Sequence, residues 1–523
     1  MKDAVMESVK ELEERVHNIT DSKETIVILE ELNAKLKGSS ADEVEEVTSL
    51  IWDISCEAKL GTAIQIKSYI VDKTMQYEYF VRYCRYISQN AGVIPADTLY
   101  FLQAQLCVTV FRYQQFNTYE VKYILWDMLK TVVSKFAKEL GDDILSPIPA
   151  GERNDNLVVV FTNQFLGMTH GPTKTALDRC EVLMRNMNKQ VILVNTSETT
   201  SLRGGILLYS IYQAGYIKEH CECDHVDYNG LTIPFFQCEN NMPDIDTIRQ
   251  ILNMVRDLKP KYLVNIGGDD ITSNLAAKII PAVTIDLCPS ETTGTLAACQ
   301  TVTRPLIKED YELLDKLSIP KWHYLEATFT SSLKEQTEKH SRQEIGVADD
   351  AFTAGIMGAR LDVDLTEEFL NLLCKASKEY KVHYIVFGKF DNIAIIEDKY
   401  PELVSFFHYV GFVSDALSYL ELCDIYINPT RRGGGTAAIE ALYKGCPVLT
   451  TPFGDTSTGV GEEFWTKSYD TMLDLIGKYA SDKEFLEEMS QKARERAADM
   501  LDSAAHFAEV LKKFEKVIGD EKL

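Results

Sequence analysis

The sequence lacks any uninterrupted apolar run of the roughly 18–20 residues that a membrane-spanning helix needs. It also lacks a surplus of basic residues. The net charge of its 523 residues is −25, which argues against general binding to nucleic acids or anionic membranes, since both require positive surface. The first residues are charged and do not have the pattern of a secretion signal. We therefore expect a cytoplasmic protein with no transmembrane segment and no nucleic-acid partner.

The usual spacings of disulfide frameworks and structural zinc sites are missing as well. The twelve cysteines are scattered, as is typical of reduced thiols in the cytosol. The cluster His220–His225 has the sequence His-Cys-Glu-Cys-Asp-His. It has neither the Cys-x2–4-Cys spacing of a structural zinc site nor a second Cys/His pair to complete one. We expect no metal ion and no cofactor.

The chain divides into regions of different periodicity. Residues 1–145 show helical spacing of apolar residues without a fixed repeat, which predicts an all-α domain that is not a tetratricopeptide array. Strands then alternate with helices in two series, residues 146–330 and 331–480, which predicts an α/β protein with two Rossmann-like domains. The carboxyl ends of their strands should face a shared cleft. Residues 481–523 are predicted to be helical, with one apolar stripe.

The segment 424–455 carries the most informative pattern: a strand, a loop of three glycines, a helix that begins near Thr436, and a second strand. Glycines at 433–435 let the backbone approach a ligand closely. The N–H groups and dipole at the helix start then form an anion site. Glu440 lies about one turn further on the same face, where a carboxylate can accept hydrogen bonds from a ribose diol. The pattern predicts a site for a nucleoside diphosphate.

The run from Glu440 to Thr450 resembles the E-A-x-x-x-G-x-P-V signature of GT-B glycosyltransferases, enzymes with two Rossmann-like domains that use nucleotide sugars. Retaining members carry a first acid eight residues before the second, and Arg432 stands at that position here. The preceding loop is closer to that of the O-GlcNAc transferases and bacterial adhesin glucosyltransferases. The resemblance implies that residues 481–523 pack back onto the first, acceptor-side domain. It leaves a retaining or an inverting outcome open.

Further elements resemble the GT-B donor site. Gly355–Leu361 is similar to the G-x-R-L element, which implies that Arg360 reaches the donor pyrophosphate. The family's partner lysine is missing, so Arg431 or Arg432 is expected to supply a second positive charge. Tyr409–Val413 is similar to the segment whose backbone contacts the base. The resemblance implies these donor-binding residues: Gly358, Arg360, Gly411, Phe412, Arg431, Arg432, Gly433, Gly434, Gly435, Thr436, Ala437, Glu440 and Asp455.

The first Rossmann-like series contains the candidates for proton transfer. Val160–Thr173 has the pattern of a strand, a loop and a helix start, and His170 in that loop can take a proton near neutral pH. The O-GlcNAc transferases carry a similar His-Pro-Thr element. His170 is the candidate general base, although the donor phosphate could act instead and the histidine could simply form hydrogen bonds. Asp269 is either an alternative base, a ligand of acceptor hydroxyls or part of a solvated turn. With Arg360, these are the candidate catalytic residues.

These patterns favour a metal-independent hexosyl- or N-acetylhexosaminyltransferase whose donor is a nucleotide sugar, with UDP favoured. Protein-modifying GT-B enzymes place helical domains before the catalytic halves, so residues 1–145 favour a protein or glycopeptide acceptor, with a glycan also open. The same helices are expected to be the surface for an oligomer or a partner subunit. Two alternatives stand beside this interpretation: a nucleotide-sugar 2-epimerase on the same fold, and a catalytically silent GT-B subunit that stabilises a partner transferase. The donor sugar and the acceptor are not predicted.

Overall fold

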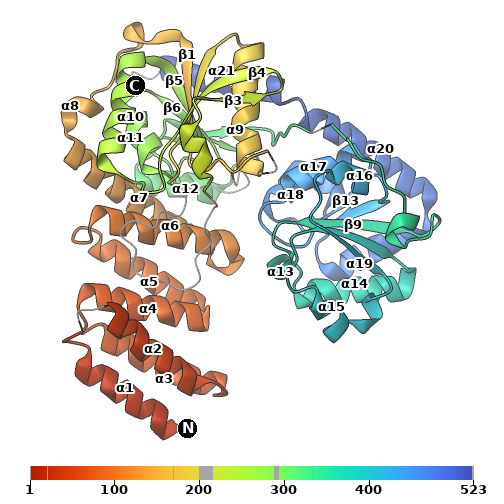
Figure 1. Cartoon of the computed structure of the whole chain (residues 1–523), viewed down its shortest axis with the longest axis horizontal. Helices are drawn as coiled ribbons and strands as arrows, with labels where there is room; N and C mark the ends of the chain where they lie inside the picture. The colour runs from red at the N-terminus through yellow and green to blue at the C-terminus, as the bar shows by residue number, and fades with distance from the viewer. Residues whose placement is uncertain are drawn as a thin grey trace.

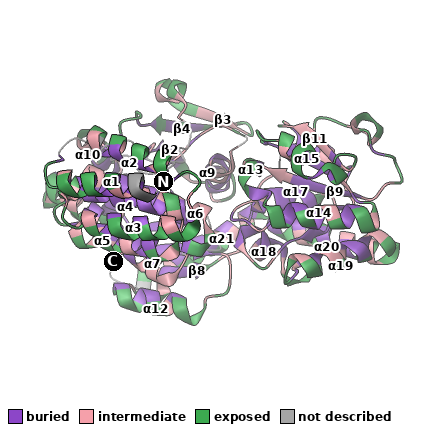
Figure 2. Cartoon of the chain, turned by 90° about the horizontal axis from the view of Figure 1, so that it is seen from below, coloured by how far each residue is buried: buried purple, intermediate pink, exposed green. Residues whose placement is uncertain are grey.

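The computed structural model describes residues 2–19, 22–168, 170–198, 216–287, 294–333 and 335–520. A column of helices at the N-terminal end carries one α/β domain at its top, and a second α/β domain lies beside the first (Figure 1). Buried residues concentrate along the strands and on the inward faces of the surrounding helices (Figure 2). No helix among the described residues combines the length and the apolar character required to traverse a bilayer.

The helical region consists of α1 (Lys2–Arg15), α2 (Ser22–Leu36), α3 (Ala41–Ser55), α4 (Leu60–Thr74), α5 (Tyr77–Asn90), α6 (Ala96–Arg112), the 3-10 helix η1 (Gln114–Phe116), α7 (Tyr119–Leu140) and α8 (Asp142–Leu145). Ser40 begins α3 with a capping box, in which its hydroxyl and the Glu43 carboxylate satisfy each other's backbone N–H groups. The apolar side chains of these helices continue without a break into the core under the first sheet. Trp126 of α7 also donates a hydrogen bond to the carbonyl of Thr295, at 3.1 Å. The helical region is therefore packed onto the first α/β domain.

The first α/β domain is built on an eight-stranded sheet in the order β3-β4-β2-β1-β5-β6-β7-β8. Its strands are β1 (Asn154–Thr162), β2 (Gln190–Asn195), β3 (His225–Tyr228), β4 (Leu231–Gln237), β5 (Pro260–Ile266), β6 (Ala282–Ile285), β7 (Cys299–Val302) and β8 (Tyr324–Glu326). All pairs are parallel except the β3–β4 hairpin. In β1, the run from Leu157 to Thr162 is completely buried, as expected of a central parallel strand covered on both faces. The helices α9 (Gly171–Glu181), α10 (Ile245–Leu258), α11 (Ile271–Ile279) and α12 (Lys308–Leu317) connect these strands.

The second α/β domain has a five-stranded, all-parallel sheet in the order β11-β10-β9-β12-β13. The strands are β9 (Thr353–Gly358), β10 (His383–Gly388), β11 (Phe407–Gly411), β12 (Ile425–Ile427) and β13 (Val448–Leu449). Its helices are α13 (Leu361–Asp364), α14 (Glu367–Tyr380), α15 (Ala394–Lys399), α16 (Ala416–Leu420), α17 (Gly435–Tyr443), α18 (Gly454–Val460), α19 (Tyr469–Ser481) and α20 (Lys483–Met500).

The two C-terminal helices lie in different domains. In α21 (Ser503–Asp520), Phe507, Val510, Leu511 and Phe514 are buried in the core of the first domain, and Figure 1 places the C-terminus there. By contrast, Met489, Ala493, Ala497 and Met500 of α20 belong to the core of the second domain. The expectation that residues 481–523 as a whole pack on the first domain is therefore corrected for α20. Its apolar residues face α17, and the chain crosses back only after Met500.

Candidate functional site

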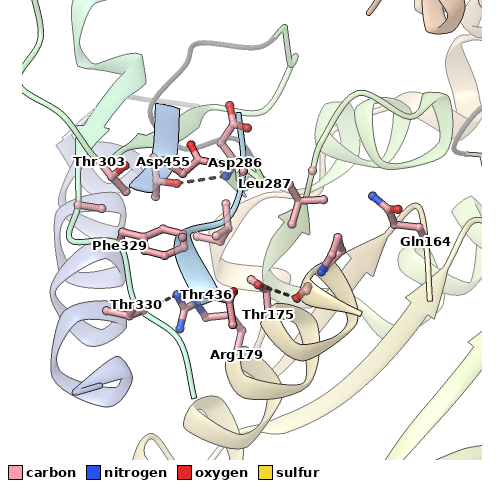
Figure 3. Close-up of a pocket in the computed structure, with 18 of the residues that line it drawn as sticks. Gln164, Thr175, Arg179, Asp286, Leu287, Thr303, Phe329, Thr330, Thr436 and Asp455 are labelled. Atoms are coloured by element: carbon pink, nitrogen blue, oxygen red, sulfur yellow. Dashed lines mark hydrogen bonds between the residues drawn. The ribbon is translucent and has the colours of Figure 1, made fainter. Parts of the chain in front are cut away.

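A cavity of about 430 Å³ lies between the two α/β domains and the end of α6. In the first domain it is bounded by the carboxyl ends of β1, β5, β6 and β7, which is where ligands bind in parallel sheets. The glycine loop before α17 lines it from the second domain, and α21 and the segment after β8 line another side. Figure 3 shows Thr436 and Asp455 of the second domain, and Thr175 and Arg179 of α9, in the wall of this cavity.

The glycine loop adopts a conformation that side chains would hinder. Gly433 and Gly434 have φ values of +77° and +85°, in the left-handed region that favours glycine. A Cβ on Gly435 would lie 2.6 Å from the ring of Phe329, so this position tolerates no side chain without displacement of that ring. Three glycines and Thr436 line the cavity where the nine-residue helix α17 begins. The predicted anion site therefore opens onto the cavity.

Glu440 lies in the second turn of α17 and is only 8% exposed. Its Oε1 is 3.6 Å from Nζ of Lys174, a residue of α9 in the opposite domain. This ion pair joins the two domains beside the cavity. Lys174 could not be predicted from the sequence, since no local pattern relates the start of α9 to a helix more than 250 residues away.

The three arginines near the loop differ in how many of their guanidinium N–H groups donate hydrogen bonds to other parts of the protein. Arg431 donates from Nη1 to Asp364 at 2.9 Å, from Nη2 to the Met357 carbonyl at 2.7 Å, and from Nε to Asn428 at 3.0 Å. It does not line the cavity and fastens the end of β9 to the loop. Gly358 at that end leaves room for it, because a Cβ there would lie 2.6 Å from Nη1 of Arg431.

Arg360 and Arg432 keep part of their hydrogen-bonding capacity. Arg360 donates from Nε to Asp364 at 3.1 Å and from Nη2 to the Arg432 carbonyl at 2.7 Å. Its Nη1 has no partner among the described residues. Arg432 is 7% exposed, and its Nε and Nη2 are buried with no partner in the described part of the chain. Of the two alternatives for the second positive charge, the geometry favours Arg432 over Arg431.

His170 and Asp269 both line the cavity, from different loops of the first domain. His170 stands at the N-cap position of α9, with Nδ1 3.1 Å from the hydroxyl of Thr173. Burial lowers the pKa of its imidazole to about 4, so the ring is neutral near pH 7. Asp269 accepts a hydrogen bond from Nδ2 of Asn163 at 2.7 Å, and burial raises the pKa of its carboxyl. Either group could therefore face a reacting hydroxyl.

The remaining predicted donor residues are divided between the cavity and its surroundings. Asp455, at the start of α18, lines it. Ala437 is buried in the first turn of α17 behind the loop and does not line it. Gly411 ends β11 and Phe412 follows it, two strands from β9, and the Phe412 side chain is 69% exposed. The structure thus brings the glycine loop, Thr436, Asp455, His170 and Asp269 together around the cavity. The other predicted donor-binding residues lie outside its lining: Gly358, Arg360, Gly411, Phe412, Arg431, Arg432, Ala437 and Glu440.

Several other lining residues gave no signal in the sequence. Arg179 of α9 is buried, forms an ion pair with Asp178 and donates to the Thr330 hydroxyl at 2.8 Å (Figure 3). Burial lowers its pKa, and Asp178 opposes that shift. Asp286, after β6, brings a further carboxylate to the wall. Phe111 of α6 also lines the cavity. In the sequence, Arg179 looks like part of a solvated helix face and Phe111 like part of a helical core.

No group of three or more His, Cys, Asp or Glu side chains is placed to hold a metal ion in the parts of the chain that the structure covers.

Comparison with known proteins places these features in a family context. Residues 356–482 match the family described as glycosyl transferases group 1. No curated protein sequence matches the chain significantly. Among solved structures, a point mutant of the O-GlcNAc transferase of Thermobaculum terrenum is similar with a TM-score of 0.55 and 12% identity, over 96% of this chain and 99% of that chain.

Two further structures are more distant in shape. A glycosyltransferase from Rickettsia africae has a TM-score of 0.48 and 11% identity, over 70% of this chain and 100% of that one. The Anabaena protein HepE, solved with UDP and glucose, has a TM-score of 0.46 and 13% identity, over 69% of this chain and 99% of that one. At TM-scores below 0.5 these likenesses are too loose to support a conclusion. The fold similarity over nearly the whole chain confirms the predicted GT-B architecture.

Proposed function

We propose that this protein is a glycosyltransferase that moves a sugar from a UDP-linked donor to an acceptor hydroxyl or amide. One observation carries the proposal. The glycine loop and the N-terminus of α17 open onto a cavity of about 430 Å³ at the carboxyl ends of the first sheet, with Glu440 in the next turn. This arrangement offers backbone N–H groups to a diphosphate and a carboxylate to a ribose.

The donor half supplies the electrostatics of the reaction. When the glycosidic bond breaks, negative charge grows on the leaving diphosphate. A fixed cation therefore favours the transition state over the bound substrate. Arg360 is the proposed source, because its guanidinium lies beside the glycine loop and is held by Asp364 and the Arg432 carbonyl. Arg432 adds a second buried cation.

The acceptor half supplies the proposed base. His170 is neutral near pH 7 and can accept a proton from an acceptor hydroxyl. Asp269 in the same wall is the alternative. The helical region packs against this domain and reaches the cavity through α6, which supports a protein or glycopeptide as the acceptor. Hexosyl or N-acetylhexosaminyl donors both remain within the proposal.

Replacement of Glu440 by alanine should weaken the binding of UDP by about 1.5–3 kcal/mol, the range for hydrogen bonds to a charged group. The change removes the proposed ribose contact and the ion pair with Lys174. Isothermal titration calorimetry with UDP measures it. Glu397→Ala, at an exposed position of α15, is the matched control and should bind UDP normally. Unchanged affinity in the Glu440 variant would refute the donor site.

EDTA should leave the transfer rate unchanged, because arginines and the α17 N-terminus neutralise the diphosphate in the proposed mechanism. Initial rates are compared before and after chelation, and again after addition of Mg²⁺ or Mn²⁺. A rate that falls in EDTA and recovers with either ion contradicts metal independence.

The carboxylates in the cavity wall also bear on the epimerase alternative. Asp269, Asp286 and Asp455 all line the cavity, and a nucleotide-sugar 2-epimerase would require paired acids there. NMR of a UDP-N-acetylhexosamine incubated with the protein separates the two reactions. A 2-epimer formed without an acceptor identifies an epimerase, whereas UDP and free or transferred sugar identify a transferase.

A further inference from the structure

The C-terminal end of α6 contacts the two arginines that keep open hydrogen-bonding capacity. The carbonyl of Val110 accepts a hydrogen bond from Nη1 of Arg432 at 2.6 Å. The guanidinium carbon of Arg360 lies over the ring of Phe111, 5.0 Å from its centroid. Since Nη2 of Arg360 also donates to the Arg432 carbonyl at 2.7 Å, the four residues form a closed set of contacts. This α6–arginine cluster joins the helical region to the second α/β domain.

The charge of Arg432 is only partly satisfied by this cluster. Its side chain is 7% exposed, and none of the described carboxylates forms an ion pair with it. The last carbonyls of a helix have no partner within the helix and carry partial negative charge, so the Val110 carbonyl is a suitable but weak acceptor for a cation. A buried cation without a full counter-charge is costly. Two N–H groups that lack partners in the described chain, Nε and Nη2, therefore point to an anionic ligand.

The contact between Phe111 and Arg360 has a geometric consequence. A ring below a guanidinium occupies its flat face and leaves the N–H groups along its edge free to bind oxygen atoms. These N–H groups bind phosphate oxygens best when the plane of the guanidinium is held in a fixed orientation. Phe111 thus restrains Arg360 without using the donors that a phosphate needs.

We propose that Phe111 and the Val110 carbonyl are positioning elements of the donor site, which hold Arg360 and Arg432 ready for the diphosphate of the nucleotide sugar. The inference rests on the proposed function and extends it, because it makes the helical region a part of the donor site. Cys107, Val108 and Phe111 of α6 also line the cavity, so three parts of the chain build one site.

The test compares Phe111→Leu with Phe111→Tyr in the full-length protein. Leucine keeps an apolar side chain but removes the ring, and should weaken binding of both UDP and inorganic pyrophosphate about three- to tenfold. Tyrosine keeps the ring and should bind both within twofold of the wild type. Phe101→Leu is the matched control: it lies on the same helix, is 2% exposed and belongs to the core. It should lower the melting temperature and leave both affinities unchanged.

A double mutant separates positioning from a general effect on structure. In an Arg360→Ala background, Phe111→Leu should cause no further loss of pyrophosphate affinity, because the ring then has no guanidinium to hold. Normal affinities in Phe111→Leu, or an equal loss with and without Arg360, overturn the inference and leave the proposed function intact. If the wild type binds pyrophosphate but no nucleoside diphosphate, the proposed function fails and the arginine site stands. If it binds neither, both fail.

Discussion

Replacement of Arg360 by alanine is expected to lower the rate of sugar transfer by about 10²–10³-fold, the loss typical of removing one charge-stabilising donor. The effect should fall mainly on kcat, because the charge on the leaving diphosphate is greatest in the transition state. Steady-state kinetics with a UDP-sugar donor separates kcat from KM. The KM of the donor should change much less.

Two further variants show whether the geometry or only the charge of Arg360 matters. Arg360→Lys should recover part of the rate, since lysine restores the charge but cannot form two parallel hydrogen bonds to phosphate. Arg85→Ala is the control, because Arg85 lies on the surface of the helical region and pairs with Glu120. If Arg360→Ala turns over normally, the phosphate-binding role passes to Arg432.

Replacement of His170 by alanine should reduce transfer by about 10²–10⁴-fold, the usual contribution of a positioned proton acceptor. UDP affinity should hardly change, because His170 belongs to the domain opposite the glycine loop. A pKa lowered to about 4 has a clear pH signature. The imidazole is unprotonated, and able to act as a base, from about pH 5 upwards, so kcat/KM should be flat there and fall as the pH approaches 4.

Asp269→Asn is the companion variant, since both side chains line the same cavity. If His170→Ala keeps its transfer rate and Asp269→Asn loses it, the base is Asp269. Its raised pKa then places the acidic limb of the pH profile above the ordinary value of an aspartate. Retained activity in both variants would leave the donor phosphate as the proton acceptor.

A short, continuous stretch of chain contains most of what local rules can predict about the candidate site. The glycine loop, the start of α17 and Glu440 lie within eight residues, and their mutual geometry follows from local backbone conformation and the helical repeat. The same reasoning predicted the α/β class, because hydrophobic periodicity reports which faces of an element are buried. Comparison with known structures confirms that architecture.

Contacts between distant segments required the tertiary structure. Arg431 and Arg432 are adjacent residues of the same type, yet Arg431 donates hydrogen bonds to Asp364 and Met357 whereas Arg432 donates to the carbonyl of Val110 in α6. Which side of a loop each side chain takes is decided by what packs there, and no local rule contains that information. The same applies to Lys174, to Phe111, and to the separation of α20 from α21.

By itself, the sequence determined the class of fold, the order of its domains and the glycine-loop motif, because each of these depends on the spacing of residues that are close together in the chain. Only the tertiary structure decided which charges remain available to a ligand and that a helix from the N-terminal region enters the site. The physical reason is that burial and pairing set the state of a charged group. Both depend on neighbours that the chain brings together only on folding.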